Sequence, residues 1–174
     1  ICCCVSMIND GIDKTRFSCS KLRFGDVPLS GDQEAFRNEL NSEFVSLCKS
    51  MPTSTQTDAL LFTIQQFKVS IADGFNFLRY FYPPAWSIAY WLIKAFPKER
   101  AFSEGDLCDA KTAHCMAMLL HPLDDHLNDN DLQVTHLVLL LRSQAWLIMI
   151  NAVQRLAGTV ENGPEIVRRS EEHT

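Results

Sequence analysis

Apolar residues recur along most of this chain with the spacing of α-helices rather than of β-strands. The first such segment, residues 31–50, has apolar side chains at intervals of four, four and three: Phe36, Leu40, Phe44 and Leu47. That spacing places them on one face of an amphipathic helix. Ser30, directly before the segment, suits the capping position of a helix N-terminus. No stretch alternates with a period of two for long enough to predict a strand.

Four further helices are predicted from the same periodicity and from the prolines and glycines that interrupt it. Their expected ranges are Thr57 or Asp58 to Phe81, Pro84 or Ala85 to Phe96, Glu104 to His121 or slightly beyond, and Asp131 to Ala157. Helices joined by short connections are typical of an all-α bundle. We therefore expect a helical bundle domain over residues 31–160. We expect residues 1–30, before this domain, to be irregular. After it, we expect residues 161–174 to form a polar tail that frays or starts a helix at Pro164.

Composition narrows the class of protein. A chain of 174 residues with 47% hydrophobic and 21% charged residues is enough for one domain with a substantial core. A net charge of −5 provides no positive field for DNA or RNA, so nucleic acid is not an expected partner. The apolar stretch 134–157 contains Arg142 and Arg155, which argues against a transmembrane segment.

The seven cysteines do not form a disulfide or zinc framework. Their number is odd and no CxxC pair occurs. Reduced thiols in a reducing compartment are expected, and this predicts a cytoplasmic protein.

One acidic segment stands out as candidate chemistry. Four carboxylates lie within eight positions at the end of an apolar helix: Asp124, Asp125, Asp129 and Asp131. Clusters of oxygen ligands suit a hard divalent cation such as Mg²⁺, whose remaining positions are filled by water and phosphate. The alternative is helix capping, which accounts well for Asp131 and for Asp129 but not for the first two aspartates. His114, His121 and Asp125 also share helical spacing, which is compatible with a transition metal.

The sequence Asp-Asp-x-x-x-Asp at residues 124–129 resembles the aspartate-rich motif of class I terpenoid synthases and related prenyl-transferring enzymes. The order of elements over about residues 60–158 is also similar: an aromatic helix, a connector, the aspartate-bearing helix and a long apolar helix. The resemblance implies that Asp124, Asp125 and Asp129 bind Mg²⁺, and that the ions hold an isoprenoid diphosphate. Asp124 and Asp125 would then serve the ionisation of that diphosphate to a carbocation, which is cyclised or quenched.

The second metal motif of that family is not found after Asp131. At the required offsets, Asn151 is followed by Arg155 and Thr159. We therefore expect either a partial chain, whose missing C-terminal half belongs to a longer precursor or is supplied by another copy in a homo-oligomer, or a fold that is reused without full activity.

Aromatic residues between 75 and 96 support two interpretations. In the enzyme interpretation Phe77, Phe81 and Trp86 line a cavity that stabilises the cation by cation–π attraction, and Arg79 reaches the diphosphate. The simpler alternative is that these aromatic side chains fill the core and that Arg79 forms a surface ion pair. In the alternative, the chain is a non-enzymatic all-α interaction domain, and the 75–96 face binds a partner.

Overall fold

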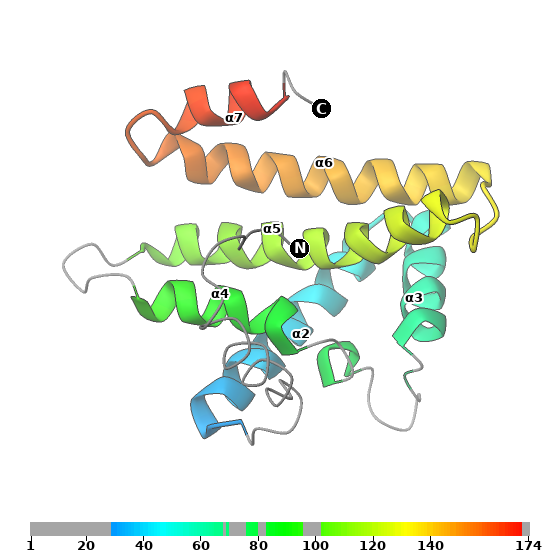
Figure 1. Ribbon diagram of the computed structural model, residues 1–174, viewed down its shortest axis with the longest axis horizontal. Coiled ribbons are helices and arrows are strands. Elements are labelled where there is room, and N and C mark those ends of the chain that lie inside the picture. The colour runs from blue at the N-terminus through cyan, green and yellow to red at the C-terminus, as the bar shows by residue number, and fades with distance from the viewer. Residues whose placement is uncertain (1–28, 68, 70–75, 80–82, 96–101, 172–174) are drawn as a thin grey trace, which may run out of the picture.

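The computed structural model describes residues 29–67, 69, 76–79, 83–95 and 102–171, and every regular element within these ranges is helical. The all-α prediction is confirmed. The elements are α2 (Gly31–Ser50), α3 (Thr53–Phe67), the 3₁₀ turn η2 (Phe77–Arg79), α4 (Pro83–Ala95), α5 (Glu104–Asn128), α6 (His136–Gly158) and α7 (Gly163–Glu171). Figure 1 shows α4, α5, α6 and α7 stacked in that order as roughly parallel rods, with α2 crossing the stack and α3 at one end.

The first predicted helix is confirmed together with its cap. The Ser30 hydroxyl accepts a hydrogen bond from the Gln33 backbone N–H at 3.3 Å, and the Gln33 side chain accepts one from the Ser30 backbone N–H at 2.9 Å. This reciprocal capping box fixes the start of α2. The buried face of α2 consists of Leu40, Phe44 and Cys48.

The start predicted for the second helix is wrong. α3 begins at Thr53 rather than at Thr57 or Asp58. The carbonyl of Pro52 accepts a hydrogen bond from the Thr55 backbone N–H at 2.9 Å, which closes the first turn ahead of the predicted cap.

The end predicted for this helix is also wrong, because α3 stops at Phe67. Its predicted end, Phe81, lies outside the described residues. Just before that point the backbone N–H groups of Phe77 and Leu78 donate to the Asn41 side-chain oxygen on α2, at 2.8 and 3.4 Å. A side chain far away in sequence thus binds two backbone donors of η2.

The fourth predicted helix, which starts at Glu104, extends beyond His121, through Pro122, to Asn128. A proline inside a helix lacks the N–H that would bond the preceding turn. Here its neighbours Leu120 and Leu123 are both buried, and their packing holds this turn in place.

The fifth predicted helix starts later than expected, at His136 rather than Asp131. The Thr135 hydroxyl provides its cap by accepting a hydrogen bond from the Val138 backbone N–H at 3.2 Å. Asn130 lies in the preceding turn with a φ of 60°, a conformation that asparagine tolerates better than most residues.

α5 is the central helix of the bundle. Its buried residues Cys115, Met116 and Leu119 pack against the buried faces of the helices around it. The largest fully buried side chains come from five elements: Trp86, Phe77, Leu40, Leu78, Met116, Leu119, Leu123 and Leu141.

Two ion pairs join α5 and α6. Asp109 accepts hydrogen bonds from Arg155, the shortest at 2.6 Å, and Asp124 accepts hydrogen bonds from Arg142 at 2.5 and 3.1 Å. The later residue on α5 pairs with the earlier residue on α6, so the two helices are antiparallel and are linked near both ends.

Within the described residues, α6 is long and apolar enough to cross a membrane by length and composition alone. Its most apolar 18 residues have a mean hydropathy of 1.4, and 17% of them are buried. Core helices of soluble proteins pass the same test, so this property does not decide where the protein resides.

Candidate functional site

Asp124, the first aspartate of the acidic segment, faces α6. Its two oxygens accept hydrogen bonds from Nε and a terminal nitrogen of Arg142, a bidentate arrangement. The same hydrogen bond raises the pKa of Arg142 above its usual value. The Asp124 carboxylate is therefore already neutralised by a cation of its own chain.

The other three aspartates of the segment are all exposed. Asp125 is exposed on the side of α5. Asp129 is the C-cap of α5, and its backbone N–H donates to the Asp125 carbonyl at 2.9 Å. Asp131 pairs with His126, with 3.5 Å between carboxylate oxygen and Nδ1, and does not cap α6. Among the residues that the structure describes, no group of three or more His, Cys, Asp or Glu side chains is arranged to hold a metal ion.

The predicted aromatic contacts fall into the core where they are described. Phe77 and Trp86 are each 1% exposed, and the Phe77 ring packs edge-on against Phe44 with centroids 5.5 Å apart. Phe81 and the side chain of Arg79 lie outside the described part of the chain. Of the aromatic residues described on α4, Trp91 is exposed.

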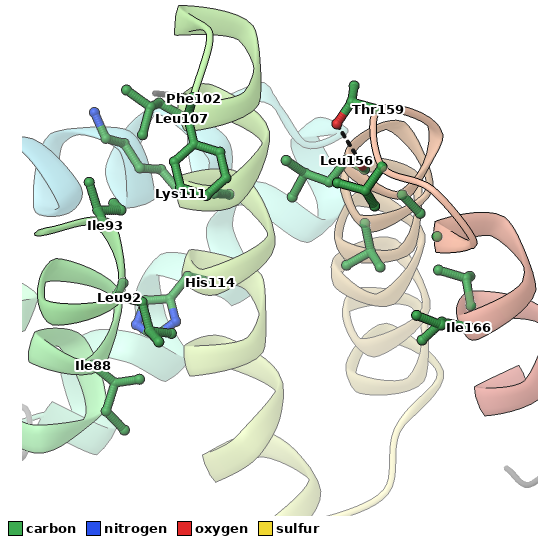
Figure 2. A pocket seen from close by; sticks show the side chains of 17 residues that line it. Ile88, Leu92, Ile93, Phe102, Leu107, Lys111, His114, Leu156, Thr159 and Ile166 are labelled. Carbon is green, nitrogen blue, oxygen red and sulfur yellow. Dashed lines mark hydrogen bonds between the residues drawn. The ribbon is translucent and has the colours of Figure 1, made fainter. Parts of the chain in front are cut away.

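An apolar groove of about 510 Å³ lies along the N-terminal half of α5, away from Asp124. Its floor is the N-terminal half of α5, with Leu107, Ala110 and His114. Figure 2 shows one wall formed by α4 and the other by the end of α6 together with α7. The α4 wall carries Ile88, Leu92 and Ile93, and the second wall carries Leu156, Val160 and Ile166.

The groove and the acidic segment are separate sites. The groove reaches His114 on α5, whereas Asp124 lies ten residues further along the same helix. At a rise of 1.5 Å per residue, this separation is roughly 15 Å. The aspartates therefore do not border the apolar groove.

The 75–96 segment, predicted as a partner-binding face, includes α4, which forms one wall of the groove. The residues of α4 that line the groove, Ile88 and Leu92, were not predicted. α4 is apolar on nearly all sides: Trp86 and Tyr90 point into the core, whereas Ile88 and Leu92 are exposed. A helix with no polar face buries two sides. That signal, together with the one-turn spacing of Ile88 and Leu92, would have indicated a second contact surface.

Known proteins provide no further guide to this site. No family model, no curated protein and no solved structure matches the chain. The function is therefore argued from the geometry of the groove and of the acidic segment.

Proposed function

We propose that this chain is a non-enzymatic helical interaction domain, and that its groove binds the apolar face of a partner. The observation that carries the proposal is the exposure of apolar side chains on both walls. Ile88 is 55%, Leu92 64% and Ile166 65% exposed. Contiguous apolar surface on a folded chain typically marks an interaction site, because its burial is favourable.

The enzyme interpretation remains a prediction, and the geometry supports it less well. An isoprenoid diphosphate site needs its metal-binding carboxylates beside the apolar pocket that receives the hydrocarbon. Here Asp124 is engaged by Arg142, and the groove lies about two to three helical turns away along α5.

Binding of a neutral amphipathic peptide tests the proposed function. The probe is a fluorescein-labelled helix of about 18 residues, with leucines along one face and glutamines and alanines elsewhere. We expect its fluorescence anisotropy to rise on titration with the full chain. Leu92→Ser should weaken this binding about tenfold, because it removes one exposed leucine from a groove wall.

Leu147→Ser is the matched control. Leu147 is also an exposed leucine on a helix, at 52%, but it does not line the groove. We expect this variant to bind the peptide like the unmodified chain. Equal losses in both variants, or no binding by the unmodified chain, would contradict the proposal.

A further inference from the structure

A second hollow of about 420 Å³ lies between α2 and α5. Leu107 and Lys111 line both this hollow and the apolar groove, so the two are neighbours on α5. Figure 2 shows the Lys111 side chain running from the groove floor toward α2.

The second hollow is acidic. It is lined by the carboxylates of Glu39, Glu43 and Glu104 and by a single ammonium group, that of Lys111. Lys111 is held by Glu39, and the Thr112 hydroxyl donates to Glu43 at 3.3 Å. Three negative charges against one positive charge leave this end of the surface with a net negative charge.

The shape of the groove suits a helix. Its exposed apolar side chains lie on two walls, with Leu92 on α4 and Ile166 on α7, on either side of α5. Helices pack with their axes 8–10 Å apart, so a helix laid over α5 lies beside both α4 and α6, the neighbours of α5 on either side (Figure 1).

We infer that the partner is an amphipathic helix whose apolar face is bordered by lysine or arginine, with those cations directed at the Glu43 and Glu104 end of the surface. This inference rests on the proposed function and adds the charge of the partner. Complementary charge at the rim of an interface contributes to specificity and orientation.

Three peptides that differ only in charge test the inference. The neutral peptide described above is compared with a lysine peptide and a glutamate peptide, in which two residues bordering the leucine face are replaced. We expect the lysine peptide to bind about fivefold more tightly than the glutamate peptide in 0.01 M salt. The difference should shrink in 0.15 M salt, where the Debye length falls from about 30 Å to about 8 Å.

A second experiment removes negative charge from the acidic hollow of the protein itself. The double variant Glu43→Gln with Glu104→Gln should bring the affinities for the lysine and glutamate peptides together, and leave neutral-peptide binding unchanged. The control Asp125→Asn with Asp129→Asn removes the same charge at the far end of α5, and should keep the difference. Circular dichroism confirms that both double variants are folded.

The outcomes separate the two proposals. If the neutral peptide binds and the lysine and glutamate peptides bind equally, the charge inference is wrong and the interaction domain stands. An equal loss of discrimination in the control variant would also overturn the inference, because the effect would then come from net charge alone. If the neutral peptide does not bind at all, the proposed function itself fails.

Discussion

The side chain of Asp124 leaves α5 toward α6, where it meets Arg142 with 42% and 35% of the arginine and aspartate side chains exposed. Partly exposed ion pairs are screened by water, so their contribution is modest. Because its geometry is bidentate, we expect this pair to stabilise the fold more than most partly exposed ion pairs do. In the sequence the same aspartate is the first residue of the Asp-Asp-x-x-x-Asp motif, and no local pattern indicates a partner eighteen positions away.

A double-mutant cycle measures this pair. Asp124→Asn and Arg142→Gln should each lower the free energy of unfolding by about 1 kcal/mol, and the double variant should lose little more than either alone. Urea denaturation of the four proteins provides the comparison. Asp125→Asn, which removes an exposed carboxylate one position away, is expected to change stability by less than about 0.5 kcal/mol. Fully additive losses would mean that the two side chains act independently.

Two buried thiols predict a loss of stability at alkaline pH. Burial raises the pKa of Cys48 from 9.0 to about 12, and also raises that of Cys115. The unfolded chain therefore releases these protons at a lower pH than the folded chain. The resulting contribution to stability is complete below pH 9 and is lost as the pH rises toward about 12.

Helical circular dichroism at increasing pH tests this. The double variant Cys48→Ala with Cys115→Ala should lose less stability than the unmodified chain between pH 9 and pH 12. Cys108→Ala is the control, because Cys108 is exposed and should leave the alkaline transition in place. An identical pH dependence in all three proteins would contradict the assignment of stability to the buried thiols.

Helix positions could be predicted from the sequence wherever local signals determine them. The Ser30 cap and the apolar spacing of residues 36–47 define α2, and the structure confirms both. The helix predicted to end at Phe81 stops instead at Phe67, and the backbone N–H groups of Phe77 and Leu78 donate to Asn41, more than thirty positions away. Periodicity within a window contains no information about such a contact.

The turn between α6 and α7 depends on a glycine. A Cβ atom at Gly163 would lie 2.1 Å from the carbonyl oxygen of Ala157 and 2.7 Å from Val160. The first of these atoms belongs to the backbone, so it cannot move aside cheaply. α7, which provides part of one groove wall, is therefore held against α6 by the absence of a side chain at this position.

Gly163→Ala should therefore displace α7. We expect a loss of about 1–3 kcal/mol in unfolding free energy, faster amide hydrogen exchange in residues 163–171 and weaker binding of the neutral peptide. Gly158→Ala is the matched control, since no atom lies within 4 Å of a Cβ at that position. Alanine there should be neutral or stabilising by up to about 1 kcal/mol. A Gly163→Ala variant that behaves like the control would show that the close approach has no energetic consequence.

At the scale of the whole molecule, the groove is built from four consecutive helices, α4 to α7. Ile88 on α4, His114 on α5, Leu156 on α6 and Ile166 on α7 line one hollow, although each belongs to a different apolar pattern. The class of fold follows from those patterns taken one at a time. The groove does not, because it depends on how far apart α4 and α6 are held on either side of α5.

Ligand-linked thermal stability distinguishes an interaction domain from a magnesium-dependent enzyme. A ligand at 100 times its dissociation constant stabilises the folded chain by about 2.7 kcal/mol, which for a chain of this size raises Tm by about 5–10 °C. We expect a shift of this size with the neutral peptide. Mg²⁺ with inorganic diphosphate should cause no shift beyond that of a sodium salt at equal ionic strength, because Asp124 is paired with Arg142.

Asp125→Ala makes this comparison decisive. If Mg²⁺ and diphosphate raise Tm in the unmodified chain and fail to do so in Asp125→Ala, with the helical signal intact, the acidic segment binds metal and the enzyme interpretation gains its missing support. If the peptide alone stabilises both proteins equally, its binding does not depend on the Asp125 carboxylate. The N-terminal half of α5 then presents apolar surface to a partner, while ion pairs near both of its ends fasten α5 to α6.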